Sequence, residues 1–206
     1  MSNILQVNSS IYAGDGQSSR LADTFVVAVR RRYPDSQLTV RDLASEPVPH
    51  LDAERFAAFL SKPEERDIEQ QAIVDYSDTL IAELERADVV VIGLPMYNFG
   101  VPSQLKAWID HVARAGVTFK YTDQGPVGLL RGKKAYVLAT RGGKYASTPA
   151  DTQTAYVRDF LEFIGITDVE FVYAEGLAMG ESIKAQALSR ANRSIRELSF
   201  ARELAA

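Results

Sequence analysis

The chain has 206 residues, of which 46% are hydrophobic and 24% are charged, and its formal net charge is −4. This length and composition predict a single globular domain, residues 1–206, with a sizeable buried core. A mildly acidic balance excludes a general affinity for polyanions, so we expect neither nucleic acid nor a membrane surface as a partner.

The rarer residue types exclude further classes. The sequence has no cysteine, which removes disulfides, thiolate nucleophiles and cysteine-ligated metals together. Its two histidines, His50 and His111, do not have metal-ligand spacing, so we expect no metal site and interpret His111 as structural. No apolar run approaches the length of a membrane span, and the sequence starts directly with a predicted strand. We therefore expect no signal peptide and a cytoplasmic location.

The first part of the chain predicts two strands around one helix. Residues 4–7 form a strand, a loop rich in small residues follows, and Leu21, Phe25 and Val29 mark the apolar face of a helix. Residues 37–41 alternate in polarity, which predicts a second strand with one apolar face. Asp42 then stands where a ribose-binding acid could lie, but we interpret it as a surface turn residue.

Two helices are predicted before the central strand. A short one lies near residues 56–60, and Lys62 and Pro63 end it. Glu64 and Glu65 predict the start of the next helix, since carboxylates are favoured at a helix N-terminus. The apolar stripe of that helix consists of Ile68, Ala72, Ile73, Tyr76, Leu80 and Leu84.

The strand at residues 89–92, with the sequence VVVI, organises the rest of the chain. Four β-branched residues in a row predict a strand buried on both faces, in the middle of a parallel sheet. In open α/β sheets, ligands bind beyond the carboxyl end of such a strand. The loop there offers a wall of sulfur, rings and one amide, which suits a planar heteroaromatic ligand; its residues are Met96, Tyr97, Asn98 and Phe99. Alternatively, these side chains only plug the end of the core.

The second half of the chain adds two more strands. Leu105, Trp108, Ile109 and Val112 recur at helical spacing and predict a helix, with Pro102 suited to its first position. Residues 117–131 predict a surface excursion that ends in a turn, and residues 134–139 a fourth strand. A helix over about residues 151–164 ends at Gly165, which fits a left-handed C-cap. Residues 169–173 predict the fifth strand, and a final helix follows.

Strand character predicts the order of the sheet. The first, third and fourth strands are almost entirely apolar, as interior strands are, whereas the second and fifth carry polar residues. With right-handed crossovers, the order 2-1-3-4-5 satisfies this pattern. It defines a flavodoxin-like, doubly wound α/β fold with a five-stranded parallel sheet and helices on both faces. The loops after strands one, three and four then meet at one edge of the sheet.

The first of these loops predicts an anion site, most naturally for a phosphate. Hydroxyls, flexible backbone and the N–H groups of a helix N-terminus lie together there. The residues concerned are Ser9, Ser10, Gly16, Gln17, Ser18 and Ser19. The alternative is ordinary helix capping by Ser18 or Ser19. Neither a G-x-G-x-x-G fingerprint nor a P-loop is present.

The loop after the fourth strand consists of Thr140, Arg141, Gly142 and Gly143. Glycines let the backbone approach a ligand closely, and free N–H groups could stabilise negative charge on a ring carbonyl. The alternative is a flexible turn without a ligand. A phosphate at one end, a planar ring at the other and no second nucleotide fingerprint together indicate flavin mononucleotide (FMN).

These motifs resemble those of the FMN-dependent azoreductases, within the flavodoxin-like quinone reductase family. The similarity covers nearly the whole chain. It rests on Ser9-Ser10, residues 95–99, Leu105-Lys106, residues 113–119, residues 132–135, residues 141–143 and residues 163–169.

The resemblance implies a homodimer with one FMN per subunit. In the family, Ser10 and the segment Gly16, Gln17 and Ser18 hold the phosphate, and residues 96–99 and 140–143 hold the ring system. Tyr121 and Phe163 occupy positions that line the substrate side. Gly16 stands where a serine is common, so a backbone N–H would replace one hydroxyl. Leu60 stands where some members carry a substrate-side arginine, which removes one reason to expect a preference for anionic dyes.

The resulting hypothesis is a two-electron reductase. NADH or NADPH would reduce FMN, and quinones or aromatic azo compounds would then accept the hydride in a ping-pong cycle, with no side chain as general base. By resemblance, NADH is the expected donor. Two alternatives remain open: a flavodoxin-type electron carrier and a flavin-binding regulatory protein without turnover.

Overall fold

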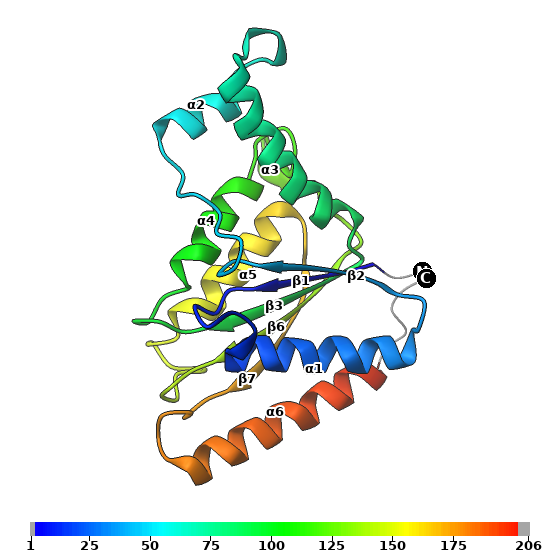
Figure 1. Ribbon diagram of the computed structural model, residues 1–206, viewed down its shortest axis with the longest axis vertical. Helices are drawn as coiled ribbons and strands as arrows, with labels where there is room; N and C mark the ends of the chain where they lie inside the picture. The colour runs from blue at the N-terminus through cyan, green and yellow to red at the C-terminus, as the bar shows by residue number, and fades with distance from the viewer. Residues whose placement is uncertain (1–2, 202–206) are drawn as a thin grey trace.

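The computed structural model describes residues 3–201 and contains a five-stranded parallel sheet (Figure 1). Its strands lie in the order β2-β1-β3-β6-β7. In chain order they are β1 (Asn3–Asn8), β2 (Gln37–Asp42), β3 (Val89–Pro95), β6 (Lys134–Thr140) and β7 (Asp168–Ala174). Because β6 and β7 are the expected fourth and fifth strands, the predicted order 2-1-3-4-5 is confirmed.

Helices cover both faces of the sheet, as predicted. On one face lie α1 (Gln17–Arg32) and α6 (Glu181–Ala201), and on the other α3 (Ile68–Arg86), α4 (Ser103–Val112) and α5 (Thr152–Ile164) (Figure 1). The central strand β3 is buried along its entire length and supplies both cores. Val90 and Ile92 pack in the core beneath α3, α4 and α5, and Val89 and Val91 pack in the core beneath α1 and α6. No helix within residues 3–201 is both long and apolar enough to cross a membrane.

Helix α3, the second of the two helices predicted before the central strand, begins later than expected. Pro63–Glu65 forms a short 3-10 turn, and α3 begins at Ile68. Asp67 and Gln70 form a capping box, in which each side chain accepts the other residue's backbone N–H. These hydrogen bonds satisfy orphan donors directly, so they outweigh the dipole attraction of exposed glutamates.

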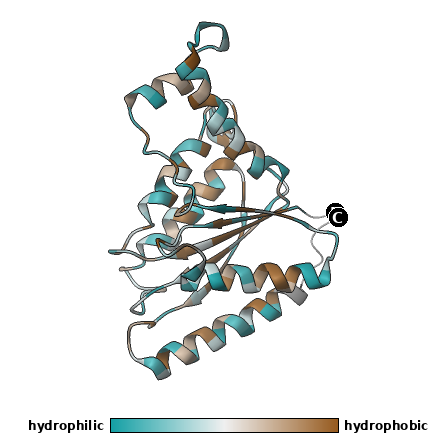
Figure 2. Ribbon diagram, in the orientation of Figure 1, coloured by the Kyte–Doolittle hydropathy of each residue, from teal (hydrophilic) through white to brown (hydrophobic). Residues whose placement is uncertain are grey.

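The first turns of α3 also extend beyond the sheet together with α2 (Ala53–Leu60) (Figure 1). Ile68 and Ala72, the first members of the predicted stripe, are therefore exposed, and burial begins at Val74. The turn at Pro63–Glu65, at the tip of this projection, is hydrophilic (Figure 2).

The predicted surface excursion is an antiparallel hairpin of β4 (Phe119–Thr122) and β5 (Gly125–Gly128). It is attached to the C-terminal end of α5, where Leu130 N donates to Ile164 O at 2.9 Å. Gly165 has a φ of 106° and caps α5 in the left-handed conformation, as predicted. A side chain at Gly128 would collide with the Gly165 backbone, so glycine at this position allows the hairpin to lie close against the helix end.

Candidate functional site

The loops after β1, β3 and β6 lie together at the carboxyl edge of the sheet. Ser9 Oγ donates to Gly93 O at 2.7 Å, and Met96 N donates to Thr140 O at 2.9 Å. The hydroxyl of Tyr97 lies 3.4 Å from Ser10 Oγ, which joins the first loop to the second. The structure thus brings together the segments that sequence reasoning assigned to one site.

The first loop leaves polar groups unpaired at the start of α1. Gly16 is the N-cap, so no side chain caps the helix, and its first N–H groups have no intrahelical partner. Ser19 Oγ donates to Ala13 O at 2.7 Å, whereas Ser18 Oγ is fully buried and has no partner among residues 3–201. Neither serine caps the helix, so the capping alternative does not explain Ser18.

Gly16 stands against Ser10. A Cβ at Gly16 would lie 2.1 Å from Ser10 Oγ, far inside van der Waals contact. Ser10 Oγ also accepts the Tyr12 N–H at 3.2 Å. Glycine at this position therefore lets Ser10 fold back into its own loop, and a serine there would have to displace it.

The second loop is a tight turn with strained backbone. Asn98 and Phe99 have φ values of 49° and 63°, and Tyr97 and Gly100 exchange backbone hydrogen bonds of 3.2 and 2.9 Å around them. Two successive residues with positive φ make a type I′ hairpin turn, a conformation that a bulky residue such as phenylalanine rarely adopts. Asn98 and Phe99 are exposed and Met96 is only half-buried, so this loop does not plug the core.

The third loop exposes backbone donors. Gly142 O accepts from Ala178 N and Gly143 O from Gly176 N, which fixes the loop against the segment after β7. The N–H groups of Gly142 and Gly143 have no partner among residues 3–201. The loop is therefore a fixed turn with two free donors, not a flexible one.

Arg141 has a different place from its glycine neighbours. Its side chain is fully buried, and it forms ion pairs with Asp151 at 2.7 Å and Glu175 at 3.1 Å. Its guanidinium also lies 5.1 Å from the centre of the Tyr173 ring, and the backbone N–H of Arg141 donates to Ala174 O. Burial acts to raise the pKa of Asp151, but hydrogen bonds from Arg141 and Thr154 outweigh it and leave that pKa below its ordinary value. Arg141 therefore anchors the loop from inside the protein.

The start of α5 contributes residues that sequence reasoning missed. Gln153 is fully buried, and its Nε2 donates to Pro95 O at 2.9 Å and to Gly100 O at 2.8 Å. The hydroxyl of Thr152 donates to Phe99 O. Nothing in the sequence distinguishes these residues from ordinary first-turn residues, because their partners are backbone carbonyls of a distant loop.

Tyr121 and Phe163 lie away from the three loops. Phe163 is in the last turn of α5, about 16 Å along the helix axis from Thr152 at the site. The centre of its ring lies 4.2 Å from that of the Phe119 ring, and the centre of the Phe119 ring lies 5.5 Å from that of the Tyr121 ring. Tyr121 is 72% exposed. Within one chain, these two predicted substrate residues form an aromatic group with the hairpin instead of lining the ring segments.

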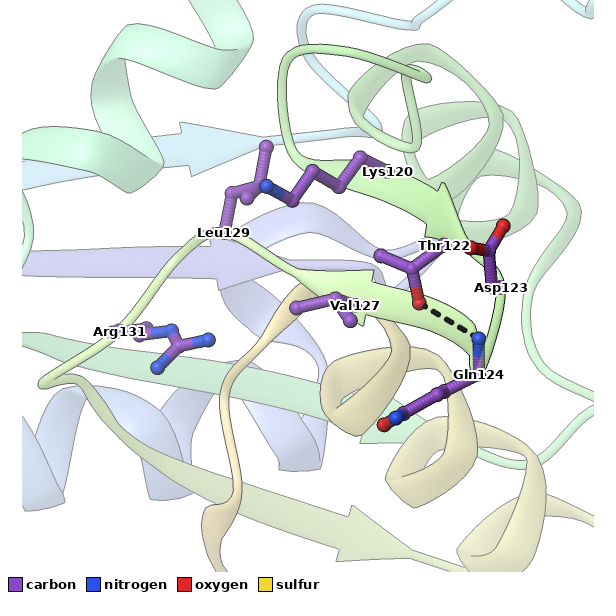
Figure 3. Close-up of a pocket in the computed structure, with 7 residues that line it drawn as sticks. All are labelled: Lys120, Thr122, Asp123, Gln124, Val127, Leu129 and Arg131. Atoms are coloured by element: carbon purple, nitrogen blue, oxygen red, sulfur yellow. Dashed lines mark hydrogen bonds between the residues drawn. The ribbon is translucent and has the colours of Figure 1, made fainter.

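Two hollows lie near these groups. One, of about 550 Å³, borders the strained turn and is lined by His50, Phe99, Gly100, Val101, Ser103, Lys106, Thr152 and Tyr156. The other, of about 490 Å³, lies on the hairpin, where Lys120 and Thr122 share one face of β4 (Figure 3). Strand alternation places Tyr121 on the opposite face. Asp42 accepts the N–H groups of Ala44 and Ser45, so it is the turn residue that we expected.

A parallel sheet of this order, with converging loops at its carboxyl edge, defines the flavodoxin-like class of α/β proteins. A family model described as "Flavodoxin-like fold" matches residues 2–198, and the chain belongs to that family. The predicted fold class is confirmed.

Relatives in this family carry more specific names. A Cellvibrio japonicus protein named FMN-dependent NADH:quinone oxidoreductase is 52% identical over 96% of this chain and 98% of its own length. An Alcanivorax borkumensis protein of the same name is 54% identical over 91% of this chain and 94% of its own. Among solved structures, an FMN-dependent NADH-azoreductase from Bacillus anthracis in complex with FMN has a TM-score of 0.88 at 26% identity, covering 97% of this chain and 98% of its own.

Proposed function

We propose that this chain is an FMN-dependent NADH:quinone oxidoreductase that also reduces aromatic azo compounds to amines. The observation that carries this proposal is the set of unpaired donors at one edge of the sheet. Ser18 Oγ and the uncapped start of α1 suit a phosphate, and the N–H groups of Gly142 and Gly143 suit a ring carbonyl. The names of the relatives support the same cofactor, donor and acceptor.

The residues present fit FMN. A buried hydroxyl without a partner costs free energy unless a ligand satisfies it, and Ser18 is such a group. In this proposal the phosphate is held by Ser10, Gly16, Gln17 and Ser18. The ring system lies between Met96, Tyr97, Asn98 and Phe99 on one side and Thr140, Arg141, Gly142 and Gly143 on the other. Arg141 acts by anchoring its loop, since its side chain is engaged inside the protein.

When bound, FMN would supply the redox chemistry, the transfer of one hydride equivalent per NADH in a ping-pong cycle, so that one cycle reduces a quinone and two cycles, with two NADH, cleave an azo bond to amines. The chain's own residues bind and orient. In this proposal the two glycine N–H groups stabilise negative charge on a ring carbonyl, and the exposed Phe99 ring gives an apolar border to the hollow of about 550 Å³. No buried acid or base of the chain is needed for proton transfer at the ring.

The active site is proposed to be shared within a homodimer. Tyr121 and Phe163 form an apolar group too far from the loops of their own chain to cover a flavin there. A two-fold arrangement would bring this group over the loops of the other subunit, where both rings could stack on an aromatic acceptor. The family resemblance supports this arrangement. A single domain and a cytoplasmic location, where NADH is available, complete the proposal.

Anaerobic mixing of the purified, FMN-loaded protein with NADH tests the function. We expect rapid two-electron bleaching of the flavin absorbance, followed by full reoxidation when a quinone is added. Slow one-electron reduction would favour an electron carrier, and no reduction at all would favour a regulatory protein. Repeating the measurement with NADPH determines the donor preference.

A further inference from the structure

The first turn of α5 is bonded to both segments to which the proposed function assigns the flavin ring. The Nε2 of Gln153 donates to Pro95 O and Gly100 O, at 2.9 and 2.8 Å. These carbonyls stand on either side of residues 96–99. Thr152, one position earlier, donates to Phe99 O inside the same turn. The side chains of two consecutive residues, Thr152 and Gln153, therefore hold the strained loop in place.

The same helix turn is tied to the other segment. Asp151 is the N-cap of α5 and accepts from Nη2 of Arg141 at 2.7 Å. Arg141 lies within residues 140–143 and is itself fixed by Glu175. Three consecutive residues at the start of α5 thus connect to both segments, and they add to the direct hydrogen bond from Met96 N to Thr140 O.

Packing alone does not account for Gln153. Its side-chain oxygen is buried and has no partner within residues 3–201, which is unfavourable in a core position. An apolar side chain of similar length would avoid that unpaired oxygen. What the amide supplies is a nitrogen that donates twice, and both bonds go to the loop whose Asn98 and Phe99 have positive φ. Strained backbone persists only where its surroundings hold it in place.

We propose that Gln153 is a positioning residue for the flavin: through its two hydrogen bonds it fixes residues 96–99 relative to residues 140–143, and it thereby sets the affinity and the reduction potential of bound FMN. This inference rests on the proposed function. Negative charge on the ring increases on reduction, so the N–H groups of Gly142 and Gly143 stabilise the reduced cofactor more than the oxidised one. When these two segments move apart, reduced FMN loses more stabilisation than oxidised FMN, and the reduction potential of the bound cofactor falls.

The test is a Gln153→Met variant, which keeps the length of the side chain and removes both N–H donors. We expect its dissociation constant for oxidised FMN to rise about tenfold, because without both hydrogen bonds residues 96–99 would hold the binding conformation about a tenth of the time. We expect reduced FMN to lose about tenfold more affinity than oxidised FMN, which lowers the two-electron midpoint potential by about 30 mV.

Ser77→Ala is the matched control. Ser77 is fully buried on α3, and its Oγ donates to the backbone carbonyl of His111 at 2.6 Å, with no contact to either segment. Its loss should lower the melting temperature and leave the FMN potential unchanged. If Gln153→Met behaves like Ser77→Ala, with lower stability but an unchanged potential, Gln153 is a structural residue and the inference is overturned.

Thr152→Val serves where Gln153→Met fails to fold. It is nearly isosteric, and it removes only the hydroxyl that donates to Phe99 O. A smaller shift of the potential in the same direction supports the inference, and an unchanged potential contradicts it. The wild-type protein separates the two proposals: if it binds no FMN, the proposed function itself fails, whereas normal turnover with an unaltered Gln153→Met potential rejects the positioning role alone.

Discussion

A buried hydroxyl without a partner is the clearest sign of a ligand in the first loop. Ser19 and Ser9 are both bonded to backbone carbonyls, but Ser18 Oγ is not bonded to any described group. The residue types alone could not separate these roles, since each serine has the same capacity for hydrogen bonding. The distinction comes from Gly16, which takes the N-cap position and leaves Ser18 free.

Ser18→Ala should weaken FMN binding by about tenfold or more, because a hydrogen bond to a charged phosphate is worth about 1.5–3 kcal/mol. Binding of riboflavin, which has no phosphate, should change little. Titration of the apoprotein with each flavin, followed by fluorescence, measures both. Equal weakening of the two ligands would show that Ser18 does not contact the phosphate.

Gly142→Val should lower FMN affinity about tenfold or more while the fold is retained, because a branched side chain would enter the ring's approach path. Gly142 is exposed, and a Cβ there would meet only Ala178 Cβ at 3.4 Å, so the loop itself has room. Circular dichroism checks the fold and a flavin titration the affinity. Wild-type affinity in this variant would remove the loop from the site.

At the scale of single elements, sequence patterns predicted the strands, their order and most helices. The hydrophobic periodicity of a segment depends on whether one face or both faces of the element are buried. The start of α3 was predicted wrongly, since the capping box of Asp67 and Gln70 competes with the nearby glutamates and wins. Only part of the role of α5 could be predicted from the sequence. Its stripe and its cap at Gly165 could be predicted, but the bonds of Gln153 to residues far along the chain could not.

The N-terminus of α5 makes a pH-dependent contribution to stability through Asp151. The pKa of Asp151 is lower in the folded protein than in the unfolded one, so its stabilising effect is complete above the unfolded value of about 3.9. It is lost as the pH falls through the folded pKa. Asp151→Asn should therefore cost about 3 kcal/mol at pH 7, the order expected when one member of a buried ion pair is neutralised.

Urea unfolding of wild type and Asp151→Asn between pH 7 and pH 3 measures this. The difference in unfolding free energy should begin to shrink below about pH 4, where the Asp151 carboxylate is protonated in the unfolded chain but still charged in the folded protein. A difference that stays constant over that range would mean that the Asp151 charge is not what stabilises the helix start.

At the scale of the whole molecule, one chain holds the parts of the proposed site at two different places. The loops lie at the first turn of α5, and the aromatic group of Phe119, Tyr121 and Phe163 lies at its last. The sequence indicated both groups but not their separation, because a helix face says nothing about what lies at each end of it. The proposed second copy of the chain would reconcile the two.

Phe163→Ala should raise the acceptor KM several-fold and leave flavin content nearly unchanged, because the ring is proposed to face the other subunit's flavin. Phe171→Ala is the matched control. Phe171 is also a half-buried phenylalanine, but it lies on the edge strand β7 and stacks on Tyr173. Steady-state kinetics with a quinone compares the two variants. Light scattering after size exclusion should give the mass of a dimer, and a fully active monomer would refute the shared site.

The strained turn at Asn98 and Phe99 sets stability and activity in opposition. Asn-Gly is the pair that a type I′ turn prefers, so Phe99→Gly should relieve backbone strain and raise the melting temperature. It would also remove a ring that is proposed to hold the flavin and that borders the neighbouring hollow, and catalytic efficiency should fall. Selection of this protein for heat resistance alone would therefore tend towards slower enzymes, and a Phe99→Gly variant that melts below the wild type would contradict this trade-off.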